Sequence, residues 1–231
     1  MKFEVVDIGG ILDPDEVACY AASQQRQIRE HYALCFDGDG DEDEYSPPKA
    51  NYSADFIMRL EPKAPKNAQD AFGFHELGIG HVFLDLASQF NTSWSSIGSH
   101  ETLEARNDLR LHKCIELDDG TIIDCEVCDR VEAFSYMIDS IELSNFNTPY
   151  CFEPPPNWKE LIKRPTLDPG LFDWMGVSHL PNQVLKDGYA QRYVPGKGWE
   201  QIGEMRPYRQ ALADMGLGRS NHRFRRSIIQ S

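Results

Sequence analysis

The 231-residue chain lacks the run of about 20 apolar residues that a membrane-spanning helix requires. Its first ten residues, MKFEVVDIGG, are too short and too acidic for a secretory leader. Composition also argues against general disorder, because 41% of the residues are hydrophobic and 26% are charged, as in globular proteins. We therefore expect a folded protein that is made in a cytoplasm and is kept there or packaged into a particle.

Several catalytic signatures are missing as well. The sequence contains no G-x-S-x-G, no glycine-rich phosphate-binding loop with lysine, and no G-x-G-x-x-G. A cysteine–histidine nucleophile pair is left open, although no motif supports it. The formal net charge of −14 repels nucleic-acid backbones and anionic lipids. We expect neither nucleic acid nor a membrane as a partner.

The six cysteines show only one close pair, the C-x-x-C of Cys125 and Cys128. Cys114 and Cys151 could complete a four-thiolate zinc site, but the second close pair of a zinc ribbon is absent. Without a secretion signal, free thiols are the expected state.

Charge is unevenly distributed along the chain. The acidic block Asp37 to Glu44 resembles a calcium loop, but the sixth and twelfth positions hold Glu42 and Pro48 instead of Gly and Glu. A solvated loop is the better interpretation. The stretch from Arg206 to Arg226 carries six arginines and one acid. It could bind an acidic partner surface or form a solvated terminus.

Hydrophobic patterning predicts an α/β (α+β) fold with a mixed sheet of about four or five strands and two principal helices. The helices are expected from Pro14 to about Tyr32, after an Asp13 cap, and from about Trp94 to Asn107. A hairpin is expected at Asp118-Asp-Gly120. Strands are expected at residues 2–8, 33–36, 54–60, 80–86, 121–127 and 136–143. Residues 1–153 would form the domain, 154–205 an irregular segment packing on or beyond it, and 206–231 an arginine-rich tail.

The second helix contains His100-Glu-Thr-Leu-Glu104, an H-E-x-x-E pattern. Residues i and i+4 share a helix face, so His100 and Glu104 could hold one metal ion. Glu101 would stand beside the ion, where a zinc-dependent hydrolase places its general base. The usual zincin pattern is H-E-x-x-H, and a carboxylate in place of the second histidine is also a sound zinc ligand.

Other candidate ligands lie downstream and upstream of this motif. Glu126 and Asp129 belong to an acid-rich run after a predicted strand, and either could be the third ligand, with Asp129 preferred. Glu126 could instead orient His100. His75 opens a glycine-containing turn that leads into the 80–86 strand, and it could line the site. His112 does not fit the metzincin spacing and is expected at the surface.

Taken together, five ordered motifs resemble a family of uncharacterised zincin-like proteins from bacterial and bacteriophage genomes. They are Gly73-Phe-His75, Val82-Phe-Leu, Ser99-His-Glu-Thr-Leu-Glu104, Glu126-Val-Cys-Asp129-Arg-Val-Glu132 and Ser144-Asn-Phe. The resemblance covers about residues 14 to 153 and implies a metallopeptidase-like fold, with Glu126 and Asp129 near His100. One departure is Arg130, which stands where that family usually has proline or a small residue.

Two functions are compatible with these patterns. The first is a Zn²⁺-dependent metallopeptidase that cleaves a peptide or protein substrate and uses Glu101 as its base. In zincins, the strand before the metal helix lies at the sheet edge and aligns the substrate. The second is a structural bacteriophage virion protein that keeps an inactive zincin-like fold and binds other virion proteins, or itself, through its C-terminal segment. Truncation at about Met205 would then abolish assembly and leave the core folded.

Overall fold

The computed structural model describes residues 1–36, 44–46, 54–66, 68, 71–111, 113–163 and 170–203. The arginine-rich tail, His112 and all of the acidic block except Glu44 lie outside these residues, so the predictions for them stay predictions. Among the described helices, none has both the length and the apolar run needed to cross a bilayer.

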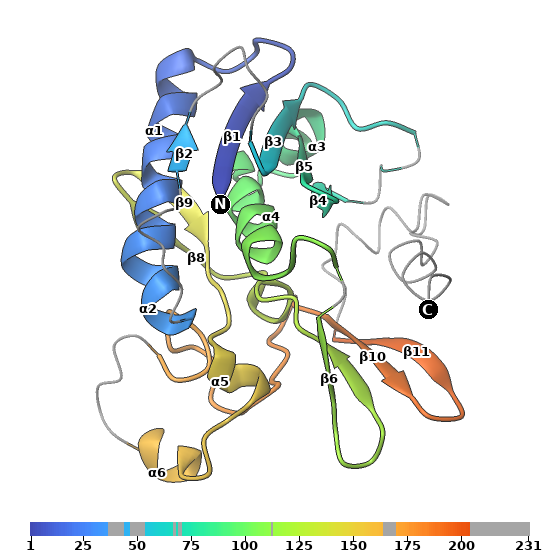
Figure 1. Ribbon diagram of the computed structural model, residues 1–231. Coiled ribbons are helices and arrows are strands. Elements are labelled where there is room, and N and C mark those ends of the chain that lie inside the picture. The colour runs from blue at the N-terminus through green and yellow to red at the C-terminus, as the bar shows by residue number, and fades with distance from the viewer. Residues whose placement is uncertain are drawn as a thin grey trace.

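A five-stranded mixed sheet forms the centre of the fold (Figure 1). Its order is β2-β1-β3-β5-β4; β4 is antiparallel to β5, and the other neighbours are parallel. The bounds are β1 (Lys2–Asp7), β2 (Glu44–Ser46), β3 (Phe56–Glu61), β4 (Gly73–Glu76) and β5 (Ile79–Phe83). The predicted α/β class with a mixed sheet of four or five strands is confirmed.

Two long helical segments pack beside each other on this sheet (Figure 1). The first comprises α1 (Pro14–Arg26), a π-helix (Gln27–Tyr32) and α2 (Ala33–Phe36). The second is α4 (Trp94–Asp108), which contacts β4 and β5. The helix prediction for residues 94–107 is confirmed. The core between the layers contains Phe3, Val5, Tyr20, Ile28, Phe56, Met58, Leu60, Val82, Ile97 and Leu103.

Smaller elements cover the rest of α4. The hairpin of β8 (Ser135–Ile138) and β9 (Ile141–Ser144) packs against it, and α3 (Leu84–Gln89) lies beside it. A second sheet, in the order β11-β10-β7-β6, lies below α4 in Figure 1. Its strands are β6 (Cys114–Glu116), β7 (Ile122–Asp124), β10 (Ala190–Val194) and β11 (Gly198–Ile202). The helices α5 (Pro149–Phe152) and α6 (Trp158–Leu161) and a short 3₁₀-helix (Asp129–Val131) complete the described elements.

Four strand predictions were wrong, at least in part. The strand expected at 121–127 ends at Asp124. Residues 33–36 are helical because the preceding helix continues, and Tyr32 stacks on Phe36 one turn later. The strand expected at 80–86 ends at Phe83, where α3 begins. Residues 136–143 form a hairpin, because Asp139 and Ser140 both take positive φ angles, as a tight two-residue turn requires.

Residues 154–205 contain more regular structure than the sequence suggested, since β10 and β11 form a hairpin there. This segment packs on the preceding part of the chain. Strand β10 pairs with β7, and the amide of Tyr189 donates to the carbonyl of Asp129 at 3.0 Å. The segment therefore borders the acid-rich run that contains the candidate ligands.

The contact between the two long helices depends on Gly98. A Cβ at this position would lie 2.6 Å from the hydroxyl oxygen of Tyr20 and 3.1 Å from its ring carbon Cζ. We expect Gly98→Ala to lower the free energy of unfolding by about 1–3 kcal/mol, the usual cost of overpacking. Urea unfolding would measure it.

Tyr20→Phe supplies the control, because it removes the atom that the new methyl group meets first. The loss caused by Gly98→Ala should be smaller in a Tyr20→Phe background. Equal losses in both backgrounds would show that the close helix contact is not the cause.

Candidate metal centre

The helix α4 is well defined at its start and buried along most of its length. The Ser93 side chain caps it by accepting from the amide of Ser96 at 3.3 Å. The sheet covers one side of α4 and the β8–β9 hairpin covers another. Its polar motif residues therefore lie in the interior: the exposed fractions are 8% for His100, 4% for Glu101 and 0% for Glu104.

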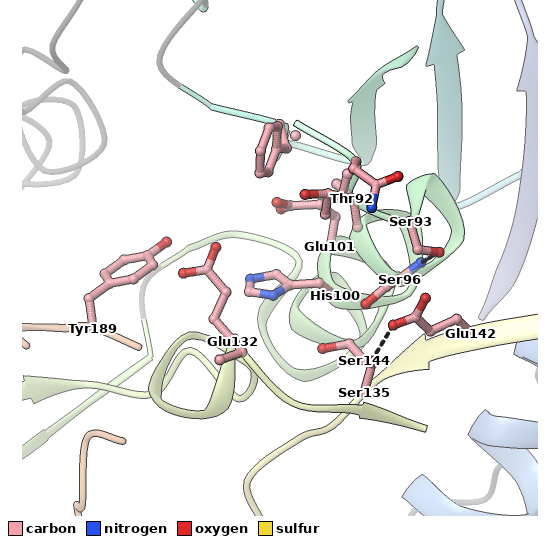
Figure 2. Close-up of a pocket in the computed structure, with 15 residues that line it drawn as sticks. Thr92, Ser93, Ser96, His100, Glu101, Glu132, Ser135, Glu142, Ser144 and Tyr189 are labelled. Atoms are coloured by element: carbon pink, nitrogen blue, oxygen red, sulfur yellow. Dashed lines mark hydrogen bonds between the residues drawn. The ribbon is translucent and has the colours of Figure 1, made fainter. Parts of the chain in front are cut away.

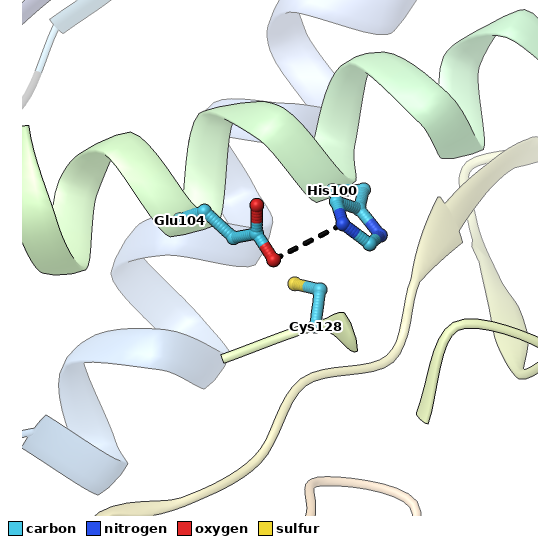
Figure 3. A group of neighbouring side chains, drawn as sticks. All are labelled: His100, Glu104 and Cys128. Atoms are coloured by element: carbon cyan, nitrogen blue, oxygen red, sulfur yellow. Dashed lines mark ion pairs between the residues drawn. The ribbon is translucent and has the colours of Figure 1, made fainter. Parts of the chain in front are cut away.

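His100 and Glu104 face each other along one side of α4, as their i, i+4 spacing predicted (Figure 3). Nε2 of His100 lies 3.0 Å from Oε1 of Glu104. The same nitrogen lies 3.1 Å from Oδ1 of Asp129, which begins a short 3₁₀-helix (Asp129–Val131). The thiol of Cys128 also faces this pair in Figure 3. The ligand atoms of His100, Glu104 and Cys128 all lie within 4.8 Å of one another.

A second group of potential ligands adjoins the first. Nδ1 of His75, on β4, lies 3.0 Å from Oε2 of Glu101 and 3.7 Å from Oε2 of Glu104. These three residues also place their ligand atoms within 4.8 Å of one another. Gly73 lets β4 approach α4 this closely, since a Cβ there would lie 2.8 Å from Ile97 and 2.5 Å from the carbonyl of His81.

The electrostatics of Glu104 fit a cation at this position. Its hydrogen-bonding demands are unmet: both carboxylate oxygens are buried without a hydrogen-bond partner, because the short contact with His100 lacks hydrogen-bond geometry. Burial raises the pKa of Glu104, and the negative charge of Asp129 raises it further. Such a carboxylate is costly to ionise without a positive charge beside it.

The charge state of His100 follows from the same surroundings. Burial alone would lower its pKa, but the charge of Glu104 and the hydrogen bond with Asp129 outweigh burial and hold the pKa well above its usual value. One imidazole nitrogen thus faces two carboxylates and carries at most one proton between them. A metal ion can bind the nitrogen and both oxygens together, which a proton cannot do.

A polar pocket of about 240 Å³ opens onto this centre (Figure 2). Its lining includes His100 and Glu101 from α4, together with Glu132, Glu142 and Tyr189. In Figure 2, Tyr189 and Glu132 lie on one side of His100 and Glu142 on the other. A molecule in this pocket would meet His100 and Glu101 directly, whereas Glu104 is closed off from solvent.

Hydrogen bonds outside the motif fix the position of α4. The hydroxyl of Ser99 donates to Oε1 of Gln27 at 2.8 Å and accepts from the amide of Ser144 at 3.1 Å. The amide group of Gln27 donates to the carbonyl of Ser144 at 2.8 Å, which closes the network. The serines of the S-H-E and S-N-F motifs therefore serve to join α4, the first helical segment and β9.

Arg130 is an internal ion-pair residue. Its guanidinium is 1% exposed, lies 2.8 Å from Oδ1 of Asp124 and sits 5.0 Å from the ring centre of Phe152. Asp124 also accepts from the amide of Gln191 at 2.7 Å. Arg130 thereby anchors the segment that carries Cys128 and Asp129 to β7 and β10.

The structure brings together His100, Glu104 and Asp129, with Glu101 beside them. Glu126 is half-buried, and neither Glu126 nor Asp129 belongs to the two compact ligand groups, although Asp129 contacts His100 at 3.1 Å. His75 lies in strand β4 and not in the predicted turn, and it contacts Glu101 and Glu104, which the sequence does not predict. The sequence suggests Cys128 only for a four-thiolate site, which does not occur among the groups found in the described residues. Its position next to Asp129 in the E-x-C-D motif was the available signal.

Comparisons of this chain with family models, curated proteins and solved structures found no match. The functional argument therefore rests on the geometry of the site.

Proposed function

We propose that this chain is a zinc-dependent, zincin-like hydrolase that cleaves peptide bonds, with the ion held by His100, Glu104 and Asp129. The observation that carries the proposal is the position of His100 Nε2, which faces carboxylate oxygens at 3.0 Å and 3.1 Å. One of those carboxylates, Glu104, is fully buried without a hydrogen bond. A nitrogen and two carboxylates form a donor set that zinc accepts, and three protein ligands are typical of catalytic zinc sites.

When bound, a zinc ion lowers the pKa of coordinated water and polarises a carbonyl group. The chain's own residues would supply the remaining functions. Glu101 borders the pocket and can accept a proton there as general base. His75 holds the Glu101 carboxylate through a contact of 3.0 Å and so fixes its orientation. Tyr189, which also lines the pocket, can donate a hydrogen bond to a substrate oxygen.

Strand β4 supports a peptide as the substrate. Within the described residues it is one of the two edge strands of the main sheet, the other being β2, and Phe72 and Gly73 at its start line the pocket. An extended peptide can pair with such an edge and lie across the centre. The sequence-based expectation assigned the edge to the strand at 80–86, which was wrong because β5 lies between β3 and β4.

Chelation tests this proposal. Purified protein should cleave unstructured peptides in a mixed pool, and removal of the metal with a chelator should abolish cleavage. Added Zn²⁺ should restore it, and mass spectrometry of the products would show both changes. Cleavage that persists in the metal-free protein would contradict the proposal, as would zinc-loaded protein that cleaves no peptide of the pool.

The position of Cys128 favours one alternative, a structural zinc site such as a virion protein would retain. A thiolate as fourth ligand beside His100, Glu104 and Asp129 would close the coordination sphere. Burial and the charge of Glu104 raise the pKa of the Cys128 thiol well above its usual value in the metal-free centre, as burial does for Glu104, but a bound zinc ion deprotonates a thiol that coordinates it. Substitution of Cys128 therefore separates the two sites. A catalytic site with three ligands should keep nearly the same zinc affinity in Cys128→Ser, whereas a large loss of affinity would support the structural site.

A further inference from the structure

The two ligand groups of this centre meet at a single carboxylate. Glu104 belongs to both, since one group is His100, Glu104 and Cys128 and the other is His75, Glu101 and Glu104. Its two oxygens face different histidines: Oε1 lies 3.0 Å from Nε2 of His100, and Oε2 lies 3.7 Å from Nδ1 of His75. This arrangement is the one expected of a carboxylate that bridges two cations.

We infer that the chain binds a second divalent cation, held by His75, Glu101 and Glu104, with Glu104 bridging it to the ion at His100. The inference rests on the metal site of the proposed function and extends it to a two-ion centre. Two-metal hydrolases hold their ions about 3.5–4 Å apart, close enough for one carboxylate to span both. One nitrogen and two carboxylates again form a suitable donor set for Zn²⁺ or Mn²⁺.

Burial makes this second group a built site. His75 is 1% exposed, Glu101 4% and Glu104 0%. Both carboxylate oxygens of Glu104 are buried without a hydrogen-bond partner. The site thus combines a compact set of ligand atoms with a buried carboxylate whose bonding capacity is unmet.

The charge balance favours two ions over one. Ionised Glu101, Glu104 and Asp129 contribute three negative charges, and metal-bound histidines are neutral. Arg130 follows Asp129 in the chain but is paired with Asp124 at 2.8 Å. With the pocket-lining carboxylate of Glu132 counted as a fourth negative charge, one divalent cation leaves a net charge of −2, and a second brings it to zero. Buried charge of one sign is costly, so a site facing an acidic pocket accommodates the second ion better.

Substitution of His75 distinguishes a two-ion centre from a one-ion centre, because His75 belongs only to the second ligand group. Glu101 cannot do so, since its loss would remove a base and a ligand together. His81 is the matched control: it lies on neighbouring β5, and its Nδ1 contacts Oε1 of Glu61 at 2.7 Å, outside both groups.

Equilibrium dialysis of the full chain against Zn²⁺, followed by metal analysis, is the test. We expect two tightly bound ions per chain for the wild type and for His81→Gln, and one for His75→Gln. His75→Asn serves as a second variant, and thermal melting of each metal-free protein identifies those that fold. X-ray absorption of the zinc-loaded wild type needs no variant and should show a zinc–zinc distance of about 3.5–4 Å.

The outcomes distinguish the two proposals. One ion in the wild type that survives in His75→Gln would overturn the second site and leave the proposed function intact, with His75 only orienting Glu101. Two ions retained in His75→Gln would place the second ion elsewhere and overturn the inference. No bound ion in the wild type would overturn both.

Discussion

Replacing His100 with alanine should weaken zinc binding at the centre between α4 and Asp129 by more than about 100-fold, since loss of a residue that merely orients a ligand already costs about 10–100-fold. The imidazole is the only nitrogen donor in its ligand group. Its removal leaves Glu104 and Asp129 facing each other's charge without a neutral ligand between them. Competition with a zinc-binding dye would measure the affinity.

His81→Ala is the control for this substitution, because it removes an imidazole of similar burial outside the site. It should leave zinc affinity unchanged. Equal affinities of wild type and His100→Ala, with both proteins folded by circular dichroism, would show that the ion binds elsewhere.

Replacing Glu101 with glutamine should keep the ion at His100 and reduce the rate of peptide hydrolysis by at least about 10²–10⁴-fold, because it removes the general base and also a carboxylate ligand of the inferred second ion. The amide preserves the size of the side chain and its place beside the pocket, but it cannot take up a proton. The hydrogen bond with His75 can persist, because the amide oxygen also accepts. Rates would be measured on the best peptide found in the chelation experiment, at saturating zinc.

Glu142→Gln is the matched control, since Glu142 lines the same pocket and hydrogen-bonds with Ser135. It should retain most of the activity. A Glu101→Gln variant that hydrolyses as fast as the wild type would exclude Glu101 as the base. If the protein binds zinc and neither variant changes any activity or assembly, the ion is structural and the virion hypothesis gains support.

The parts of the fold that the sequence predicted are those with strong local signals. Helix α4 has a serine cap at Ser93 and the i, i+4 spacing of His100 and Glu104. Both features can be recognised in the sequence, because neither depends on tertiary contacts. The helix from Pro14 has an aspartate cap and proline at its first position. The hairpin at Asp118-Asp-Gly120 follows from its turn residues, and β6 pairs with β7 there.

The strand predictions failed where a short apolar run shows neither the period of a helix nor that of a strand clearly. Ala33-Leu-Cys-Phe36 suits a strand or a helix, and only the continuation of the preceding helix decides it. Residues 136–143 alternate as one strand would, and the turn at Asp139 and Ser140 lacks the glycine that usually marks such a hairpin.

The candidate site was predictable along α4 but not across the fold. His75 reaches Glu101 over 26 residues, and Asp129 reaches His100 over 29. Spacing along the chain carries no information on such contacts, since they depend on how β4 and the 3₁₀-helix pack against α4. For the same reason, the sharing of Glu104 by two ligand groups emerges only from the structure.

An anomalous difference map at the zinc absorption edge tests the central claim most directly, namely that α4 carries a metal centre. Crystals of zinc-loaded wild-type protein should show a strong peak between Nε2 of His100 and the carboxylate of Glu104, within bonding distance of Asp129. Crystals of well-ordered, zinc-loaded protein that show no anomalous peak beside His100 and Glu104 would contradict the account.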